Sequence, residues 1–188
     1  MDLTEQEAIA RLKQGDIGGL EFLVRRHQTE AMRAVYLITR NQAGAEDIVQ
    51  AAFLRAYERI EQFDSHRSFR PWFLRSVIND AFKSTAWEGR QVSLEAVLEE
   101  AEAALTDRLN DSAPGPADLA EVSDTRQRVW LALGQLSPLQ RAAIVQRYYL
   151  GLSENDMAAA ADCAPGTIKW RLHTARNRLR ALLRPLDL

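Results

Sequence analysis

Residues 153–183 read SENDMAAAADCAPGTIKWRLHTARNRLRALL, and this stretch decides the fold of the second half of the chain. Ser153 suits the N-cap of one helix, and Pro165 suits the first position of the next. ADCAPG between them is a short turn, and Pro185 stops the second helix. The stretch therefore predicts two helices joined by a tight turn.

The second of these helices has an apolar face and a basic face. The apolar residues recur at helical spacing and are expected to be buried: Ile168, Leu172, Ala175, Leu179 and Leu182. A helix-turn-helix places its second helix in the major groove of DNA, with its N-terminal residues at the base edges. We therefore expect Thr167, Lys169 and Arg171 to lie near DNA.

The same helix carries basic residues along its whole length. Six of them, and no acidic residue, lie between Pro165 and Arg184. Arg176 and Arg178 stand further along the helix and suit phosphate contacts, which position a protein without specifying a sequence. A basic face is also an ordinary solvated helix surface, and the pattern alone leaves both interpretations open.

Charge is distributed unevenly over the 188 residues, although the net charge is only −2. Residues 1–88 hold 12 basic and 13 acidic side chains, and residues 89–125 hold 2 and 9. Residues 126–188 hold 10 and 4, so the C-terminal part can bind a polyanion while the whole chain stays near neutral.

Composition and the N-terminal sequence indicate a cytoplasmic protein. The chain is 46% hydrophobic and 27% charged, and no apolar run reaches the roughly 20 residues that span a bilayer. The start, MDLTEQEAIARLKQGD, lacks the apolar core of a signal peptide, so we expect no membrane insertion. A single cysteine, Cys163, excludes an internal disulfide and a cysteine-built zinc site.

The periodicity predicts an all-α fold with two small helical domains. Residues 1–88 suit a four-helix domain, with helices from about 5, 20–40, 43–62 and from 68 or 69 onward. Residues 89–124 are acidic and Ala-rich and contain Pro-Gly-Pro, which indicates a linker. Residues 125–188 form the second domain, in which Val129, Trp130 and Leu133 are expected to point inward and a helix runs from Pro138 to about residue 149.

Nothing in the pattern indicates an enzyme, a cofactor or a metal site. The three histidines, His27, His66 and His173, fall in three separate predicted elements. Glu46 and Asp47 are adjacent and point to different sides of a helix. The early glycines have no preceding strand that would form a phosphate-binding loop.

Four blocks resemble extracytoplasmic-function (ECF, group 4) sigma factors of bacterial RNA polymerase, members of the sigma-70 family. GTIKWRLHTARNRLRALL resembles their final helix, with the pattern G-T-V-K-S-R-L-x-R-A-R-x-x-L. LGQLSPLQRAAIVQRYYLGLSENDMAAAADCAPGT resembles the rest of that domain. AEDIVQAAFLRAYERIEQFD resembles the polymerase-binding helix, and FRPWFLRSVINDAF resembles the helix that opens the minus-ten element. The resemblance implies a sigma factor for promoter recognition, promoter melting and transcription initiation.

The resemblance also implies roles for individual residues. Polymerase clamp contacts fall on Asp47, Gln50, Phe53 and Leu54, and minus-ten contacts on Arg70, Trp72, Arg75 and Asn79. Minus-thirty-five contacts fall on Lys169, Trp170, His173 and Thr174, with Arg171 and Arg176 nearer the DNA backbone. Periodicity by itself favours a core position for Leu54 by about two to one and leaves Trp72 evenly divided between core and site.

Three positions depart from the family pattern. Ala51 stands where Glu is frequent, and Trp170 stands where a small Ser is usual, so its indole favours a thymine methyl or a different groove fit. The stretch KSTAWEGRQ lacks the common run of arginines, so non-specific grip on a melted strand should be reduced.

The resemblance implies three partners: core RNA polymerase, bound through its clamp helices and flap, promoter DNA, and an anti-sigma factor. A free-standing helix-turn-helix regulator remains an alternative, although the two-domain layout and the lack of a dimerisation heptad argue against it. A helical adaptor whose basic face binds an acidic protein is a third hypothesis.

Overall fold

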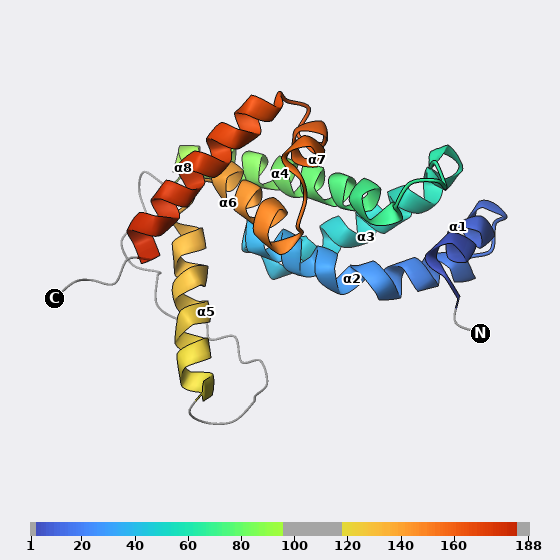
Figure 1. Cartoon of the computed structure of the whole chain (residues 1–188), viewed down its shortest axis with the longest axis horizontal. Helices are drawn as coiled ribbons and strands as arrows, with labels where there is room; N and C mark the ends of the chain where they lie inside the picture. The colour runs from blue at the N-terminus through green and yellow to red at the C-terminus, as the bar shows by residue number, and fades with distance from the viewer. Residues whose placement is uncertain (1–2, 96–117, 184–188) are drawn as a thin grey trace.

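The computed structural model describes residues 3–95 and 118–183, with side chains described for residues 3–85 and 125–183. Every regular element in these ranges is a helix, so the predicted all-α class is confirmed (Figure 1). The helices are α1 (Glu5–Lys13), α2 (Gly18–Thr39), α3 (Gln42–Glu58), the 3-10 helix η1 (Ile60–Gln62), α4 (Phe69–Glu95), α5 (Asp118–Gly134), α6 (Pro138–Ile144), the π-helix η2 (Val145–Tyr149), α7 (Glu154–Ala160) and α8 (Pro165–Leu183).

The N-terminal unit, α1 to α4, begins with a capped helix that lies very close to the next one. Thr4 and Glu7 form the predicted capping box of α1. Gly19 allows α1 and α2 to approach, because a Cβ at that position would lie 2.2 Å from the carbonyl oxygen of Ala8. A side chain at residue 19 would therefore force the two helices apart.

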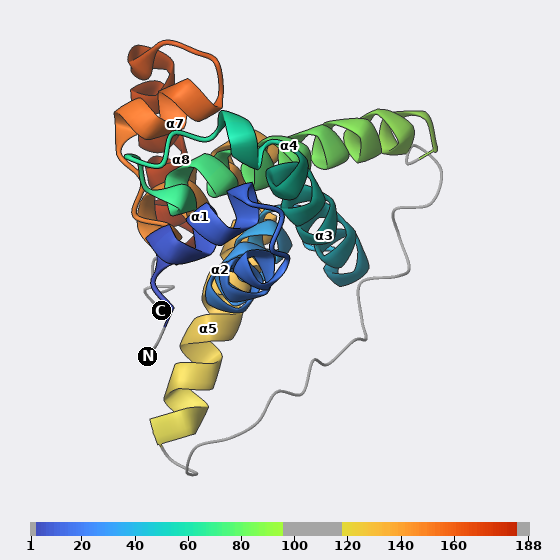
Figure 2. The ribbon, with the colours of Figure 1, turned by 90° about the vertical axis from the view of Figure 1, so that its right-hand side faces the viewer.

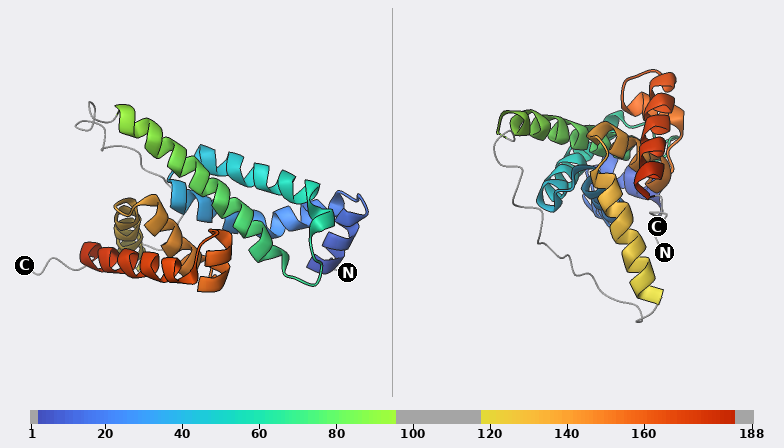
Figure 3. Two further views of the ribbon diagram at one scale, coloured as in Figure 1. Left: turned by 90° about the horizontal axis from the view of Figure 1, so that it is seen from above. Right: turned by 90° about the vertical axis from the view of Figure 1, so that its left-hand side faces the viewer.

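Aromatic rings fill the space between α2, α3 and α4, which lie side by side (Figure 3). Phe73 of α4 stacks on Phe53 of α3 with ring centroids 4.3 Å apart, and on Phe69 at 5.6 Å. Both Phe69 and Phe73 are completely buried. These rings account for the rigid position of α4 relative to α3.

The hydrophobic core continues from the N-terminal unit into the C-terminal unit, α5 to α8. Helix α6 packs against α2 and α4, and α7 packs against α4 (Figure 2). Buried residues of the C-terminal unit, among them Val145, Leu152 and Met157, belong to the same cluster as the core of the N-terminal unit. The two units therefore share one interior in this structure.

A buried arginine joins the two units. Arg141 of α6 is 8% exposed, and its guanidinium donates to three carbonyl oxygens. These oxygens belong to Leu133 at 2.9 Å, Leu136 at 3.1 Å and, across the interface, Ile38 at 2.8 Å. Burial, with the charge of Arg40, lowers the pKa of Arg141 from its ordinary value.

A second interface contact involves Trp130 of α5. Its ring stacks on Tyr36 of α2 with centroids 4.9 Å apart, and the guanidinium of Arg40 lies 4.4 Å from its centroid. Arg40 ends α2 in the left-handed conformation, with φ 62°. A Cβ at Gly134 would lie 1.6 Å from Nη1 of Arg40, so this glycine makes room for the arginine.

Several local expectations are corrected. Val129 is 40% exposed, because α5 turns Trp130 toward the N-terminal unit instead. Leu182 is 42% exposed near the end of α8, beyond the buried residues that contact the core. The helix from Pro138 does not continue regularly, since α6 gives way to the π-helix η2. Residues 43–62 are likewise interrupted, by Arg59 between α3 and η1.

The starts of α6 and α7 follow the predicted signals. Ser137 and Ser153 each form a capping box, with Gln140 and Asp156 respectively. Helix α4 continues to Glu95 and α5 begins at Asp118, so both reach into the range 89–124 that the sequence marks as a linker.

We expect Arg141→Met to lower the free energy of unfolding by about 2–4 kcal/mol, because it removes the three buried hydrogen bonds that the guanidinium donates. Urea unfolding followed by circular dichroism measures this. Arg128→Met, at an exposed position of α5, is the control and should change stability by less than about 0.5 kcal/mol. Equal effects of the two substitutions would contradict the role assigned to Arg141.

His27 gives the fold a pH dependence. It is 4% exposed, its Nε2 lies 3.0 Å from Oε2 of Glu5, and it packs on Phe69. Burial lowers the pKa of His27 below its ordinary value of 6.5, against the opposing effect of Glu5. A depressed pKa means that the unfolded chain takes up the proton first, so this contribution to stability is complete above about pH 6.5 and is lost as the pH falls below it.

Accordingly, the free energy of unfolding should fall as the pH is lowered from 7.5 to 5.5, and His27→Gln should reduce that slope. Gln retains a donor for Glu5 but does not titrate. His66→Gln, in an exposed loop, is the control and should leave the slope unchanged. The same slope in the native chain and in His27→Gln would exclude this explanation.

Candidate nucleic-acid interface

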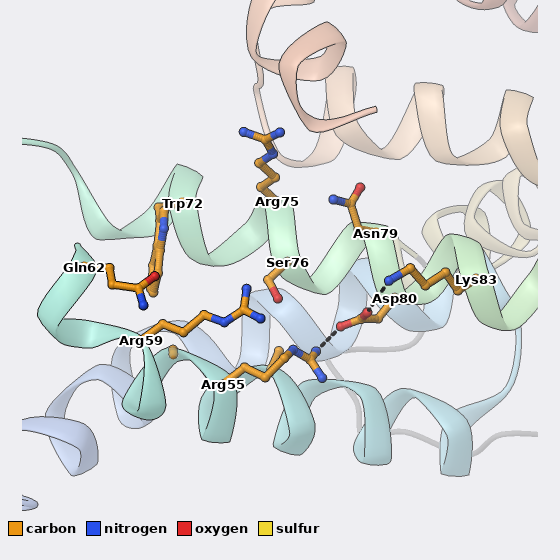
Figure 4. A pocket seen from close by; sticks show the side chains of 11 residues that line it. Arg55, Arg59, Gln62, Trp72, Arg75, Ser76, Asn79, Asp80 and Lys83 are labelled. Atoms are coloured by element: carbon orange, nitrogen blue, oxygen red, sulfur yellow. Dashed lines mark hydrogen bonds and ion pairs between the residues drawn. The ribbon is translucent and has the colours of Figure 1, made fainter. Parts of the chain in front are cut away.

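A groove between α3 and α4 is lined by basic side chains (Figure 4). Arg55 comes from α3, Arg59 directly follows the last residue of α3, and Arg75 and Lys83 come from α4. Asp80 is the acidic residue of the lining and pairs with Arg55 and, at 3.9 Å, with Lys83. We call this feature the basic groove. Its full lining is Ala52, Arg55, Ala56, Arg59, Gln62, Trp72, Arg75, Ser76, Asn79, Asp80 and Lys83.

Three of the four predicted minus-ten residues line the basic groove: Trp72, Arg75 and Asn79. Figure 4 shows Arg75 and Asn79 on the side of α4 that faces away from α3, with Trp72 extending toward Gln62. Arg75 is exposed and Asn79 is half-buried. A guanidinium and an amide placed in this way can form hydrogen bonds with the edges of unpaired bases or with phosphates.

Trp72 belongs to both the core and the groove. Its ring lies 5.0 Å from that of Phe63 and 5.6 Å from that of Phe69, so one part is fixed by packing. The residue is only half-buried, and the remaining surface lines the groove. An aromatic ring held in this way offers a rigid stacking surface for a base.

Arg70, the fourth predicted residue, is occupied by protein contacts. Its Nε and Nη2 donate to the carboxylate of Glu30 at 2.9 and 2.6 Å. Nη2 also donates to the carbonyl oxygen of Leu150 in the C-terminal unit, at 2.8 Å. The hydrogen bonds to Glu30 raise the pKa of Arg70. Arg70 thus links the two units and does not line the basic groove.

The loop before α4 faces the helix-turn-helix. A second cavity is lined on one side by Phe63, Asp64, Arg67 and Ser68, and on the other by residues of the C-terminal unit. The latter are Leu152, Asp156, Ala159 and Ala160. Trp72 and Arg75 line this cavity as well as the basic groove. The first helix of the helix-turn-helix therefore lies next to the loop in this arrangement.

Helix α3 presents a mixed surface to solvent. Asp47 and Gln50 are exposed, and Leu54 is 61% exposed, which corrects the interpretation of Leu54 as a core residue. Tyr57, one turn further on, is 40% exposed. Two large apolar side chains on one exposed turn are typical of a surface that contacts another protein.

Phe53 differs from the expectation that its side chain contacts the polymerase. It is 6% exposed and stacks on Phe73, so its side chain belongs to the core and is not presented to a partner. Its helical spacing relative to Val49 and Ala56, both buried, places it on the inner face of α3.

Helix α8 carries an outward row of residues opposite its buried stripe. Ile168, Leu172 and Ala175 are buried, as predicted, and Leu179 is half-buried. The helix lies on the outside of the molecule (Figure 3). The exposed row follows the three- and four-residue spacing of one helix face, and we call it the reading ridge: Gly166, Lys169, Trp170, His173 and Asn177.

Hydrogen bonds within α8 determine which of its polar groups remain free to bond with a partner. The hydroxyl of Thr174 donates to the carbonyl oxygen of Trp170 at 3.0 Å, and Nε of Arg176 donates to that of Leu172 at 3.2 Å. Nδ2 of Asn177 lies 3.0 Å from Nε2 of His173. With Nδ2 of Asn177 as the donor, Nε2 of His173 accepts, and Nδ1 of His173 is the ring nitrogen left for a partner.

The remaining predicted residues of α8 lie at its margins. Thr167, Arg171 and Thr174 are half-buried, whereas Lys169, Trp170, His173 and Arg176 are exposed. Sequence reasoning missed Asn177, and it also missed Arg55, Arg59 and Lys83 of the basic groove. The charge of these three was visible in the sequence, but the packing of α3 on α4 places them around one groove.

Across residues 3–95 and 118–183, no helix combines the length and the apolar character required to cross a bilayer. Over the same ranges, no set of three or more His, Cys, Asp or Glu side chains is placed to hold a metal ion. Cys163 is half-buried and packs against the shared core.

These features define a class of protein: a helical DNA-binding factor with a basic groove on one unit and a helix-turn-helix on the other. A family model described as sigma-70 region 2 matches residues 23–88, and one described as sigma-70, region 4 matches residues 126–179.

Curated relatives match over nearly the whole chain. The ECF RNA polymerase sigma-E factor of Haemophilus influenzae is 30% identical over 187 residues, covering 98% of this chain and 97% of the relative. The RNA polymerase sigma-H factor of Pseudomonas aeruginosa is 26% identical over 183 residues, covering 97% and 95%. The chain belongs to the ECF group of the sigma-70 family, and it is an RNA polymerase sigma factor of transcription initiation.

Solved structures agree with this fold. The sigma factor RpoE of Bartonella quintana, in complex with the anti-sigma factor NepR, has a TM-score of 0.66 at 26% identity. The match covers 89% of this chain and 98% of that chain. CnrH, in complex with the cytosolic domain of CnrY, has a TM-score of 0.63 at 23% identity, covers 95% and 96%, and supports the fold alone.

We expect Arg75→Ala to weaken opening of the minus-ten element by about 10-fold, because a charged hydrogen-bond donor at the groove is lost. The measurement is the fluorescence of 2-aminopurine in the non-template strand, with polymerase holoenzyme formed from the full chain. Arg25→Ala is the control, since Arg25 is exposed on α2 and pairs with Glu21. Unchanged opening in Arg75→Ala would remove Arg75 from the site.

Proposed function

We propose that residues 1–88 bind core polymerase and open the minus-ten element, and that residues 125–188 read the minus-thirty-five element. Residues 89–124 connect the two. The observation that carries the proposal is the pairing, in one chain, of a basic groove with an outward reading ridge. Each surface suits a different form of DNA: the groove an unpaired strand and the ridge a duplex.

The exposed face of α3 is the polymerase contact. Asp47, Gln50 and Leu54 lie on it, and Tyr57 extends it by one turn. Exposed apolar residues bordered by polar ones resemble the centre and rim of a protein interface. Phe53 supports this face from below by packing α3 onto Phe73, and makes no contact of its own with the partner.

The basic groove holds the melted strand. Arg55, Arg59 and Lys83 supply charge for phosphates, while Trp72 offers its ring to a base. Arg75 and Asn79 supply donors at the rim. Arg70 can contact DNA only after its hydrogen bonds to Glu30 and Leu150 have been exchanged, and the second of these bonds joins the two units.

The reading ridge enters the major groove. Lys169, Trp170 and His173 reach base edges, and Arg176 contacts a phosphate. Thr167, Arg171 and Thr174 are half-buried and lie at the flanks, where they hold the helix in register with the DNA backbone.

An anti-sigma factor is the proposed regulatory partner. RpoE and CnrH were solved in complexes, one with an anti-sigma factor and one with the cytosolic domain of CnrY, and both resemble this chain over its two units together. We place the protein in the cytoplasm, with RNA polymerase, and expect it to have no catalytic activity of its own.

Run-off transcription with purified core polymerase over a library of promoter variants tests the proposal. Lys169→Glu should reduce promoter-directed transcript by about 10- to 100-fold, because it places a like charge against DNA and removes a base contact. Binding of the chain to core polymerase should not change.

The matched control is Arg126→Glu, the same charge reversal at an exposed position of α5. It should retain transcription. Binding to promoter duplex as a dimer without polymerase would instead support the free-standing regulator. Failure of the native chain to associate with core polymerase would refute the proposal.

A further inference from the structure

Trp170 is exposed in a way that the fold does not explain. It is 67% exposed, the highest fraction among the exposed large hydrophobic residues of the described chain. Trp72 and Trp130, by contrast, are half-buried and make ring contacts with neighbouring aromatic residues. Within the described part of the chain, Trp170 takes part in no aromatic pair. A large indole held in water is suited to contact a partner.

Gly166 lies four residues before Trp170, on the same face of α8. A Cβ at Gly166 would have no neighbour within 4 Å, and its φ is not positive. Neither packing nor backbone conformation therefore requires glycine there. Gly166 is the second residue of α8, where alanine has the higher helix propensity and would fit without a clash, so the fold gives no reason for the bare backbone beside the indole.

The chemistry of the major groove limits what such a pair can bind. The C5-methyl of thymine is the apolar group that base pairs present there, and the other edges present hydrogen-bond donors and acceptors. The indole offers a broad apolar surface and one donor, Nε1–H, with no acceptor. Lys169 and His173, on either side of it, are donors that suit purine acceptors instead.

We propose that Trp170 and Gly166 form an apolar step that receives the C5-methyl of one thymine in the minus-thirty-five duplex. The indole packs on the methyl, and the bare backbone at Gly166 lets the edge of that base pair approach the helix. This inference rests on the proposed function, in which the reading ridge lies in the major groove. It makes Trp170 the residue that specifies one base pair of the promoter.

The test replaces thymine by uracil, which removes the methyl and nothing else. A promoter is first selected by run-off transcription with holoenzyme from a library randomised in the upstream element. Each thymine of that element, on either strand, is then replaced singly by deoxyuridine, and holoenzyme binding is measured. We expect one position to lose about 4-fold in affinity, the value of one buried methyl, and the others to be unaffected.

Two protein variants test whether the affinity lost with uracil arises at the apolar step of Trp170 and Gly166. Trp170→Ser should bind the thymine and uracil duplexes equally, at the lower affinity. Gly166→Ala should bind the thymine duplex more weakly. The melting temperature of this protein variant should stay the same or rise, because alanine favours the helix. A loss of duplex affinity without a loss of protein stability shows that the substitution affects recognition and not folding. Leu182→Ser, an exposed apolar residue at the far end of α8, is the control and should keep the preference for thymine.

The inference fails if no uracil substitution changes affinity, if the selected element contains no thymine, or if Trp170→Ser retains the preference. In each of these cases the native chain still directs transcription, so the proposed function stands. If the native chain directs no transcription from any member of the library, the proposed function fails, and the inference fails with it.

Discussion

The guanidinium of Arg141 is the contact on which the arrangement of the two units depends. Its hydrogen bonds end on carbonyl oxygens at or just beyond the C-terminal ends of α2 and α5. Such oxygens lack partners within their helices and carry the negative end of the helix dipole. They replace a carboxylate as the counter-charge of the buried arginine. Because Ile38 belongs to the other unit, this environment is complete only when the units are together.

The two proposed DNA-binding surfaces differ in how far contacts between the units cover them. The reading ridge of α8 faces outward, whereas Arg70 is held between Glu30 and Leu150, and α7 lies next to the loop before α4. Contacts between the units therefore occupy part of the surface proposed for the melted strand. The shared core and the stacking of Trp130 on Tyr36 hold the units in this position.

Much of the candidate site could be predicted from the sequence, because helical spacing determines which residues share a face. The same spacing does not determine where the buried face ends and the exposed face begins. Lys169, Trp170 and His173 follow from helical spacing, since residues opposite a buried stripe must face outward. Periodicity alone does not distinguish Leu54 from Phe53, because adjacent positions on an amphipathic helix change from core to surface within about 100° of rotation. Only the packing of α3 against Phe73 decides which of the two points inward.

The sequence by itself determined the helices, most of their ends and the basic face of α8. These properties depend on neighbouring residues, as the capping boxes at Thr4, Ser137 and Ser153 show. Only the tertiary structure decided that the two units share one core, and that Arg70 binds protein while Arg75 lines the groove. These outcomes depend on contacts between residues as many as 80 to 103 positions apart, which no local pattern encodes.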